Sequence, residues 1–217
     1  SLAEQPESFV INISADNRYR LFVNEQPVCC GPARGDILHW YYETVDIASL
    51  LKPGKNVLAV TVWNFGEMTP GAQMTLKTGL IVQGNTSKEA MVNTDDSWKV
   101  FRNLAYSPSP KNRQDVGCSD TVKGELYPWG WESMDYDDAP WSKSRMLVRG
   151  QAYGTGSGYD WVLTKRDIPL MEETFQRMQK IRRSENLTIS DSFLKGGQSV
   201  TIPAGQKASF LIDQTFL

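Results

Sequence analysis

The chain has 217 residues, of which 40% are hydrophobic and 22% are charged, the balance of a globular protein with enough apolar residues for a core. At roughly 150 residues per domain, this length predicts one complete domain and part of a second. The 23 Lys and Arg against 25 Asp and Glu give a formal net charge of -2, without a basic run that could follow a phosphate backbone, so nucleic acid and anionic membranes are not expected as partners.

Short strand patterns fill the first three quarters of the chain. Residues 9–14 and 19–23 are rich in β-branched and alternating apolar residues, and the nearly continuous apolar run 56–63 predicts a strand covered on both faces. Predicted strands occupy residues 9–14, 19–23, 37–44, 56–63, 73–82, 98–101, 146–148 and 161–163. Turn signals separate them at intervals of about 8 to 15 residues, which favours an all-β antiparallel sandwich or jelly roll over alternating β and α units.

The chain changes character after Lys165. Residues 168–182 carry apolar side chains at helical spacing and predict a short helix or linker. These side chains are Met171, Phe175, Met178 and Ile181. Strand patterns follow at residues 189–194, 199–202 and 209–212 and predict the first strands of a second β-sandwich. We therefore expect one domain at residues 1–165 and a linker with an incomplete second β-sandwich domain at residues 166–217.

Residues that commonly carry catalysis are scarce. His39 is the only histidine, so a Ser-His-Asp triad or a His-rich zinc site would depend on it alone. Three cysteines, two of them the adjacent Cys29 and Cys30 and the third the distant Cys118, predict no disulfide framework. Two acidic loop segments are expected to be solvated or to cap turns rather than to form a glycosidase pair. Their carboxylates are Asp95, Asp96, Asp135, Asp137 and Asp138.

Four positions are candidates for a binding site. Asp16 and Asn17 lie between the first two predicted strands, where their oxygens suit a hard cation such as Ca²⁺ but equally suit an Asx turn. Aromatic side chains such as Trp40 mostly pack in the core and otherwise stack on sugar faces, and Asn64 follows a predicted strand, where turn residues are common. Trp129 and Trp131, which flank Gly130, could form a second stacking platform, although packing of the long loop 124–141 is the commoner use of such residues.

A longer, ordered set of motifs resembles a known family. The motifs are SADNRYRLFVN at 14–24, GPARGD at 31–36, HWYYE at 39–43, LKPGKNVLAV at 51–60, WNFG at 63–66, WVL at 161–163 and RDIPLME at 166–172. They resemble the N-terminal, galactose-binding-like module of bacterial α-L-rhamnosidases and its passage into the next β-sandwich. One departure is Asn24-Glu25, where the family usually has Asn-Gly, and Glu is a poorer occupant of a turn position with positive φ.

The resemblance implies a galactose-binding-like jelly-roll β-sandwich that binds L-rhamnose through calcium. Carried over by position, Asp16 would contact both calcium and sugar, Asn17 would hydrogen-bond the sugar, and Trp40 would supply the apolar wall. Asn64 and the backbone carbonyl of Pro70 would complete the protein ligands of the calcium. Rhamnose has a cis vicinal diol that can chelate the ion and a 6-methyl group that can lie against an indole.

Three functions follow as hypotheses. The first is a non-catalytic, calcium-dependent module that binds a rhamnose-containing glycan, from an α-L-rhamnosidase-like glycoside hydrolase cut before its C-terminal, all-helical catalytic barrel. The alternative is a purely structural β domain that supports the missing catalytic domain and keeps a vestigial sugar site. A third is an independent adhesion or scaffold sandwich. No apolar stretch reaches the roughly 18 residues of a membrane span, and no signal peptide pattern is present. We expect a secreted, periplasmic or cell-surface protein whose export signal lies outside this sequence.

Overall fold

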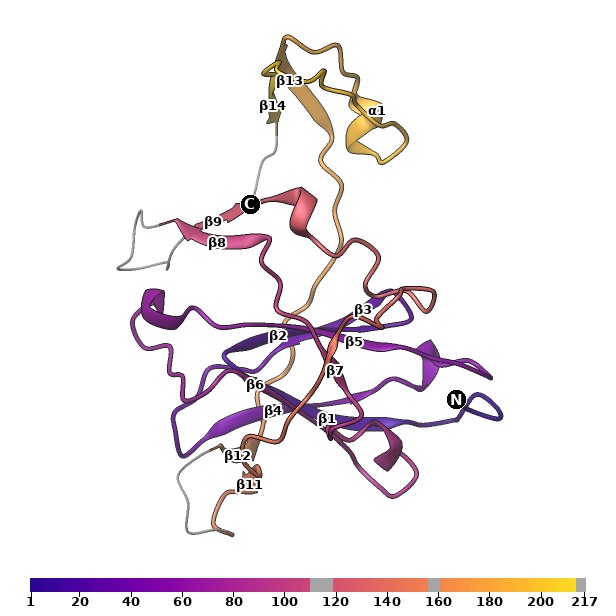
Figure 1. Cartoon of the computed structure of the whole chain (residues 1–217), viewed down its shortest axis with the longest axis vertical. Coiled ribbons are helices and arrows are strands. Elements are labelled where there is room, and N and C mark those ends of the chain that lie inside the picture. Colours follow the sequence, from indigo (N-terminus) through magenta and orange to yellow (C-terminus); the bar gives the residue numbers. More distant parts are fainter. Residues whose placement is uncertain (110–118, 156–160, 214–217) are drawn as a thin grey trace. The chain divides into compact units, whose positions relative to one another are not determined.

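The structure, a computed structural model, describes residues 1–109, 119–155 and 161–213 (Figure 1). The chain divides into two compact units, residues 1–168 and 169–217. Almost all of the regular structure described is strand, with a few 3-10 turns and one α-helix of four residues. The predicted all-β class and sandwich fold are therefore confirmed.

Two sheets form the body of the first unit (Figure 1). The larger has the order β11 (Gln151–Ala152), β12 (Val162–Lys165), β4 (Trp40–Asp46), β1 (Val10–Asp16) and β6 (Gly79–Gly84). The smaller has the order β3 (Gln26–Gly31), β2 (Arg18–Val23) and β5 (Leu58–Trp63). In the larger sheet β1 pairs antiparallel with both β4 and β6, whereas β12 joins β4 in parallel. The chain thus crosses from one sheet to the other at the end of β1.

The core lies between these sheets and follows the two-residue period of a strand. Ile11 and Ile13 of β1, and Tyr19, Leu21 and Val23 of β2, have no solvent-exposed surface. They belong to one cluster with residues of β3 and β6. The strands predicted at residues 9–14 and 19–23 are confirmed, because their alternating apolar side chains bury one face of each sheet.

Smaller elements complete the first unit. Two two-stranded ladders lie outside the main sheets, β7 (Lys99–Val100) with β10 (Ser142–Lys143), and β8 (Tyr106–Ser109) with β9 (Ser119–Val122). The 3-10 turns are η1 (Ala48–Leu50), η2 (Gly66–Met68), η3 (Ala90–Val92) and η4 (Gly124–Leu126).

The two-residue turn between β2 and β3 consists of Asn24 and Glu25. Asn24 and Glu25 both lie in the left-handed region, at φ 48° and 68°, and they connect the paired residues Val23 and Gln26. Two positive φ values in a two-residue loop are typical of a type I′ hairpin turn. The Asn24 side chain fastens the turn to the neighbouring loop, because it donates to the Leu50 carbonyl at 2.8 Å and accepts from the Val57 amide at 3.0 Å.

Several strand predictions in this unit need correction. The strand over 56–63 is real but not covered on both faces, because β5 is an edge strand and Trp63 is 39% exposed. The strands predicted at 37–44 and 73–82 begin only at Trp40 and Gly79, since the preceding residues form loops. The strand predicted at 146–148 is wrong, because this segment lies between β10 and β11 without pairing.

The second unit contains an antiparallel pair, β13 (Lys180–Glu185) and β14 (Ser209–Asp213), and the helix α1 (Asp191–Leu194). The strand predicted at 209–212 is confirmed, whereas those at 189–194 and 199–202 are wrong. The helix predicted at 168–182 is also wrong, because residues up to 179 have no regular structure and β13 then begins. Met171 and Phe175 are 84% and 80% exposed. A helical spacing of apolar residues stabilises a helix only when that face is buried.

Candidate functional site

Asp16 and Asn17 lie at the crossing from β1 to β2. Asp16 has no exposed surface and Asn17 is only 2% exposed, so neither side chain projects into solvent. The loop after β5 covers them. The Asp16 carboxylate accepts the backbone amides of Leu76 at 2.6 Å and Lys77 at 2.7 Å on one oxygen. It therefore fastens the distal half of that loop to the sandwich.

Asn64 comes to the same place from the end of β5. Its Nδ2 donates to the second Asp16 oxygen at 3.0 Å and to Thr75 Oγ1 at 2.7 Å, while its Oδ1 accepts the Gly66 amide at 2.7 Å. The structure thus joins two of the predicted calcium ligands, Asp16 and Asn64. Pro70 lies in the same loop, where its carbonyl accepts the Gln73 amide at 3.2 Å, and the contacts among the described residues do not join it to Asp16.

Asn17 supplies an oxygen with no internal partner. Its Nδ2 donates to the Met74 carbonyl at 2.6 Å, but its buried Oδ1 accepts no hydrogen bond from the described residues. A buried polar atom without a partner destabilises the folded protein, so such atoms are rare and need an explanation. An ordered water, a cation or a ligand hydroxyl at this oxygen would provide one.

A small open pocket lies beside Asn17. Its volume is only about 20 Å³, room for about one water molecule, so a larger ligand would have to lie across its open mouth. Its lining residues are Asn17, Pro32, Ala33, Arg34, Gly35, Trp40, Tyr41, Gln73 and Met74. The pocket therefore brings the predicted sugar contacts Asn17 and Trp40 together with the loop that follows β3.

Trp40 is more deeply buried than the prediction of a sugar-facing wall requires. It is 7% exposed, and its indole Nε1 donates to the Ala15 carbonyl at 3.2 Å, which ties β4 to β1. Trp40 is nevertheless one of the residues that line the pocket. It is thus a core residue at the pocket wall, and its role as the apolar wall of a sugar site stays a prediction.

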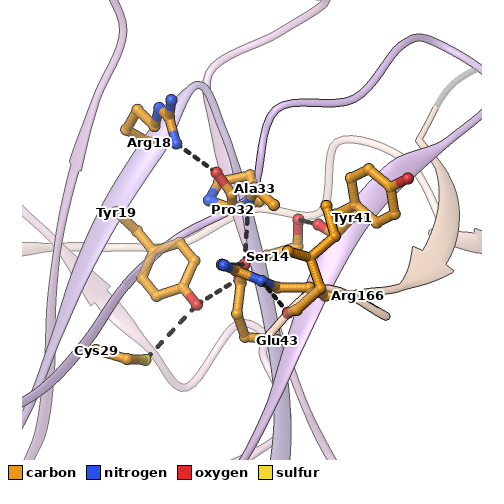
Figure 2. Close-up of polar contacts among 10 residues, drawn as sticks. Ser14, Arg18, Tyr19, Cys29, Pro32, Ala33, Tyr41, Glu43 and Arg166 are labelled. Atoms are coloured by element: carbon orange, nitrogen blue, oxygen red, sulfur yellow. Dashed lines mark hydrogen bonds and ion pairs between the residues drawn. The ribbon is translucent and has the colours of Figure 1, made fainter. Parts of the chain in front are cut away.

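The buried carboxylate of Glu43 is hydrogen-bonded to the pocket wall, and sequence analysis did not single it out. Glu43 of β4 is 2% exposed. Figure 2 shows its oxygens accepting the Tyr19 hydroxyl at 2.8 Å, the Ala33 amide at 2.9 Å and Arg166 at 3.3 Å. No short-range pattern could have revealed this group, because its partners lie up to 123 residues away.

The Tyr19 hydroxyl beside Glu43 stays protonated. Burial, followed by the nearby Cys29 and Glu43, raises the pKa of Tyr19 far above its usual range, so its hydroxyl remains a donor. Gly31 is required here because a Cβ at this position would come within 2.3 Å of Glu43 Oε2. The wall of the pocket is therefore built on a closely packed, hydrogen-bonded support.

The other candidates do not join the pocket. Asp95 accepts the amide and the hydroxyl of Ser97, and the hydroxyl bond is the main cause of its lowered pKa. Asp138 pairs with Lys99 at 2.7 Å, and Asp137 accepts the Ala139 amide at 3.0 Å. These acids cap turns or form surface pairs, as expected.

The remaining singled-out residues also have local roles. His39 pairs with Asp36 at 3.0 Å. Trp131 packs edge-on against Phe22 with ring centroids 5.6 Å apart, while Trp129 is 73% exposed. The Cys29 sulfur lies 3.7 Å from the Tyr19 hydroxyl, and Cys118 lies outside the described residues.

The described residues lack a cluster of metal ligands and a membrane-spanning helix. They contain no group of three or more His, Cys, Asp or Glu placed to hold a metal ion. Within the same residues, no helix has the length and apolar character needed to cross a membrane.

Comparison with known proteins gives rhamnosidases among the structural neighbours. No protein-family model and no curated protein matches the sequence. The GH78 family rhamnosidase of Bacillus sp. GL1 is 25% identical with a TM-score of 0.69, over 86% of this chain and 19% of that chain. The α-L-rhamnosidase from Dictyoglumus thermophilum is 17% identical with a TM-score of 0.51, over 68% of this chain and 17% of that chain, and shows similarity of fold alone. The chain spans less than a fifth of the length of these two proteins.

Proposed function

We propose that this chain is a non-catalytic carbohydrate-binding module that takes one L-rhamnose unit of a glycan in the pocket beside Asn17 and Trp40. The observation that carries the proposal is the buried, unpartnered Oδ1 of Asn17, a residue that lines an open pocket together with Trp40. A sugar hydroxyl that reaches this oxygen would donate to it, while Trp40 would give the 6-methyl group an apolar contact. Similarity to part of a GH78 rhamnosidase supports rhamnose as the sugar.

We propose that calcium assists this binding. Asn17 Oδ1 fits as a ligand because it is a hard oxygen without another partner, and Asp16 adds a carboxylate whose lone pairs are not all used. Asn64 and Pro70 are the further proposed ligands, although both oxygens already accept loop amides. When bound, the ion would be chelated by the vicinal diol of the sugar.

One observation favours a second candidate function. The Asp16 carboxylate already accepts three hydrogen bonds, from the Leu76 and Lys77 amides and from Asn64, as expected of a group with a purely structural task. On this alternative the unit only supports the remainder of a longer polypeptide, and its sugar site is vestigial.

Titration calorimetry separates the two functions. We expect L-rhamnose to bind the chain in calcium-containing buffer, and to bind at least about tenfold more weakly after chelation, because the chelated diol would lose its ion. L-mannose differs from rhamnose only by a hydroxyl at carbon 6 and is the matched control for the apolar contact, so it should bind more weakly. Absence of heat with rhamnose at millimolar concentration, in either buffer, would support the structural function instead.

A further inference from the structure

One carboxylate joins three motifs that stand far apart in the sequence. Glu43 of the HWYYE motif accepts the amide of Ala33, in GPARGD, at 2.9 Å and the guanidinium of Arg166, in RDIPLME, at 3.3 Å. Both donors use the same oxygen, Oε1. Ala33 lines the pocket, whereas Arg166 is not among the described residues that line it. Glu43 therefore connects Arg166 to the pocket at one remove.

The Glu43 carboxylate has little freedom to turn. Its side chain is 1% exposed, and its other oxygen, Oε2, accepts the hydroxyl of the fully buried Tyr19 at 2.8 Å. Oε1 is thereby directed toward Ala33 and Arg166. A buried carboxylate that loses its charged partner is strongly destabilised, because no attraction then offsets its lost hydration. Removal of the Arg166 guanidinium should therefore disturb the bond from Glu43 to Ala33.

The pocket rim is held at two consecutive residues. Arg18 donates to the Pro32 carbonyl, and the next residue, Ala33, donates to Glu43 (Figure 2). Pro32 and Ala33 line the pocket together with Asn17, which directly precedes Arg18 in the chain. The two contacts therefore fix the rim relative to the unpartnered oxygen of Asn17. A rim that is ordered before binding loses less entropy when a ligand arrives.

Arg166 is itself held in place by the chain on both sides of it. Its amide donates to the Tyr42 carbonyl at 3.0 Å and so extends the pairing of β12 with β4. Its Nε donates to the Ile168 carbonyl at 2.7 Å, and its side chain is 15% exposed. A planar guanidinium can bridge Ile168 and Glu43 at once, whereas the ammonium of a lysine is a point charge on a flexible stem.

We propose that Arg166 is a positioning residue of the pocket. Acting through Glu43, it holds Pro32 and Ala33 at the distance from Asn17 that the bound sugar requires, and it thereby raises the affinity of the site. This rests on the proposed sugar-binding function and adds to it a residue that does not touch the ligand.

Amide hydrogen exchange, followed by NMR, tests the positioning without a ligand. In Arg166→Gln we expect the Ala33 amide to exchange about tenfold faster than in the parent, because the rim opens without unfolding of the unit. The Ile47 amide, which donates to the Phe9 carbonyl at 3.0 Å in the core, should keep its rate. Equal acceleration of both amides, or an unchanged rate at Ala33, would refute the positioning role.

Titration with L-rhamnose in calcium-containing buffer, well below the melting temperature of every variant, tests the effect on affinity. Arg166→Gln should raise the dissociation constant about fivefold or more. Arg166→Lys keeps the charge without the bridge and should fall between Arg166→Gln and the parent. Arg183→Gln removes an arginine from an exposed ion pair with Glu185 and should bind like the parent.

A double-mutant cycle tests whether Arg166 acts through Glu43. With Glu43→Gln no buried charge remains for Arg166 to balance, so Arg166→Gln should weaken binding less in that background. An equal loss in both backgrounds, or parent-like binding by Arg166→Gln, would refute the proposal while sugar binding stands. If the parent itself binds no rhamnose, the proposed function is refuted, and the exchange rate at Ala33 alone decides whether Arg166 holds the rim.

Discussion

Replacing Trp40 by alanine is expected to lower the free energy of unfolding by about 3 to 5 kcal/mol, the usual result of deleting a large buried aromatic side chain. The indole is 7% exposed and its Nε1 links β4 to the Ala15 carbonyl of β1, so the variant loses apolar burial and leaves a buried carbonyl without its donor. For a unit of 168 residues, this corresponds to a fall in melting temperature of roughly 10 °C.

Thermal and urea unfolding of Trp40→Ala should be compared with Trp129→Ala, since Trp129 is 73% exposed and its removal should cost little. Trp40→Phe keeps an apolar ring but loses the indole donor, and should fall between the two. A Trp40→Ala protein that melts within about 2 °C of the parent would contradict the buried position of this residue.

Replacing Asp16 by alanine should both abolish rhamnose binding and destabilise the unit by about 2 to 4 kcal/mol. Three hydrogen bonds to a charged acceptor are lost at once, and such bonds stabilise proteins more than neutral ones. The amides of Leu76 and Lys77 lie on exposed residues, where water can replace part of the loss. The loop after β5 should therefore become more sensitive to proteases before the core unfolds.

Asp16→Asn is the matched variant, because it keeps the shape and one acceptor oxygen while removing the charge. Its loss of stability should be smaller than that of Asp16→Ala. Asp135→Ala, at an exposed carboxylate in another loop, is the control for removing a negative charge. Should Asp16→Ala unfold at the same urea concentration as the parent, with the same cleavage pattern, the anchoring of the loop by Asp16 would be wrong.

Local pattern was sufficient to predict the central strands but not the elements that depend on distant contacts. The alternating residues of β1 and β2 bury one face each, so their spacing alone identifies them. The β3 strand was missed because Gln26–Gly31 contains Pro27 and little alternation. The helix predicted at residues 168–182 failed for the opposite reason, since its spacing was right but its apolar side chains find no partner to bury them.

The candidate site shows the same division. The positions of Asp16 and Asn17 next to each other at a strand end were evident from the sequence, but their burial depends on a loop some 60 residues later. Likewise, Glu43 belongs to the motif HWYYE at 39–43, yet its role depends on the distant Arg166. A sequence pattern names residue types in order, whereas the closure of a loop over a strand end is a tertiary event that no short window contains.

The most direct test of the account is a crystal structure of the chain grown with L-rhamnose and calcium. We expect one rhamnose in the pocket, with a hydroxyl or the ion at Asn17 Oδ1 and the 6-methyl group against Trp40. Rhamnose bound only elsewhere, for example on the exposed face of Trp129, or a pocket that stays empty at saturating sugar, would contradict it.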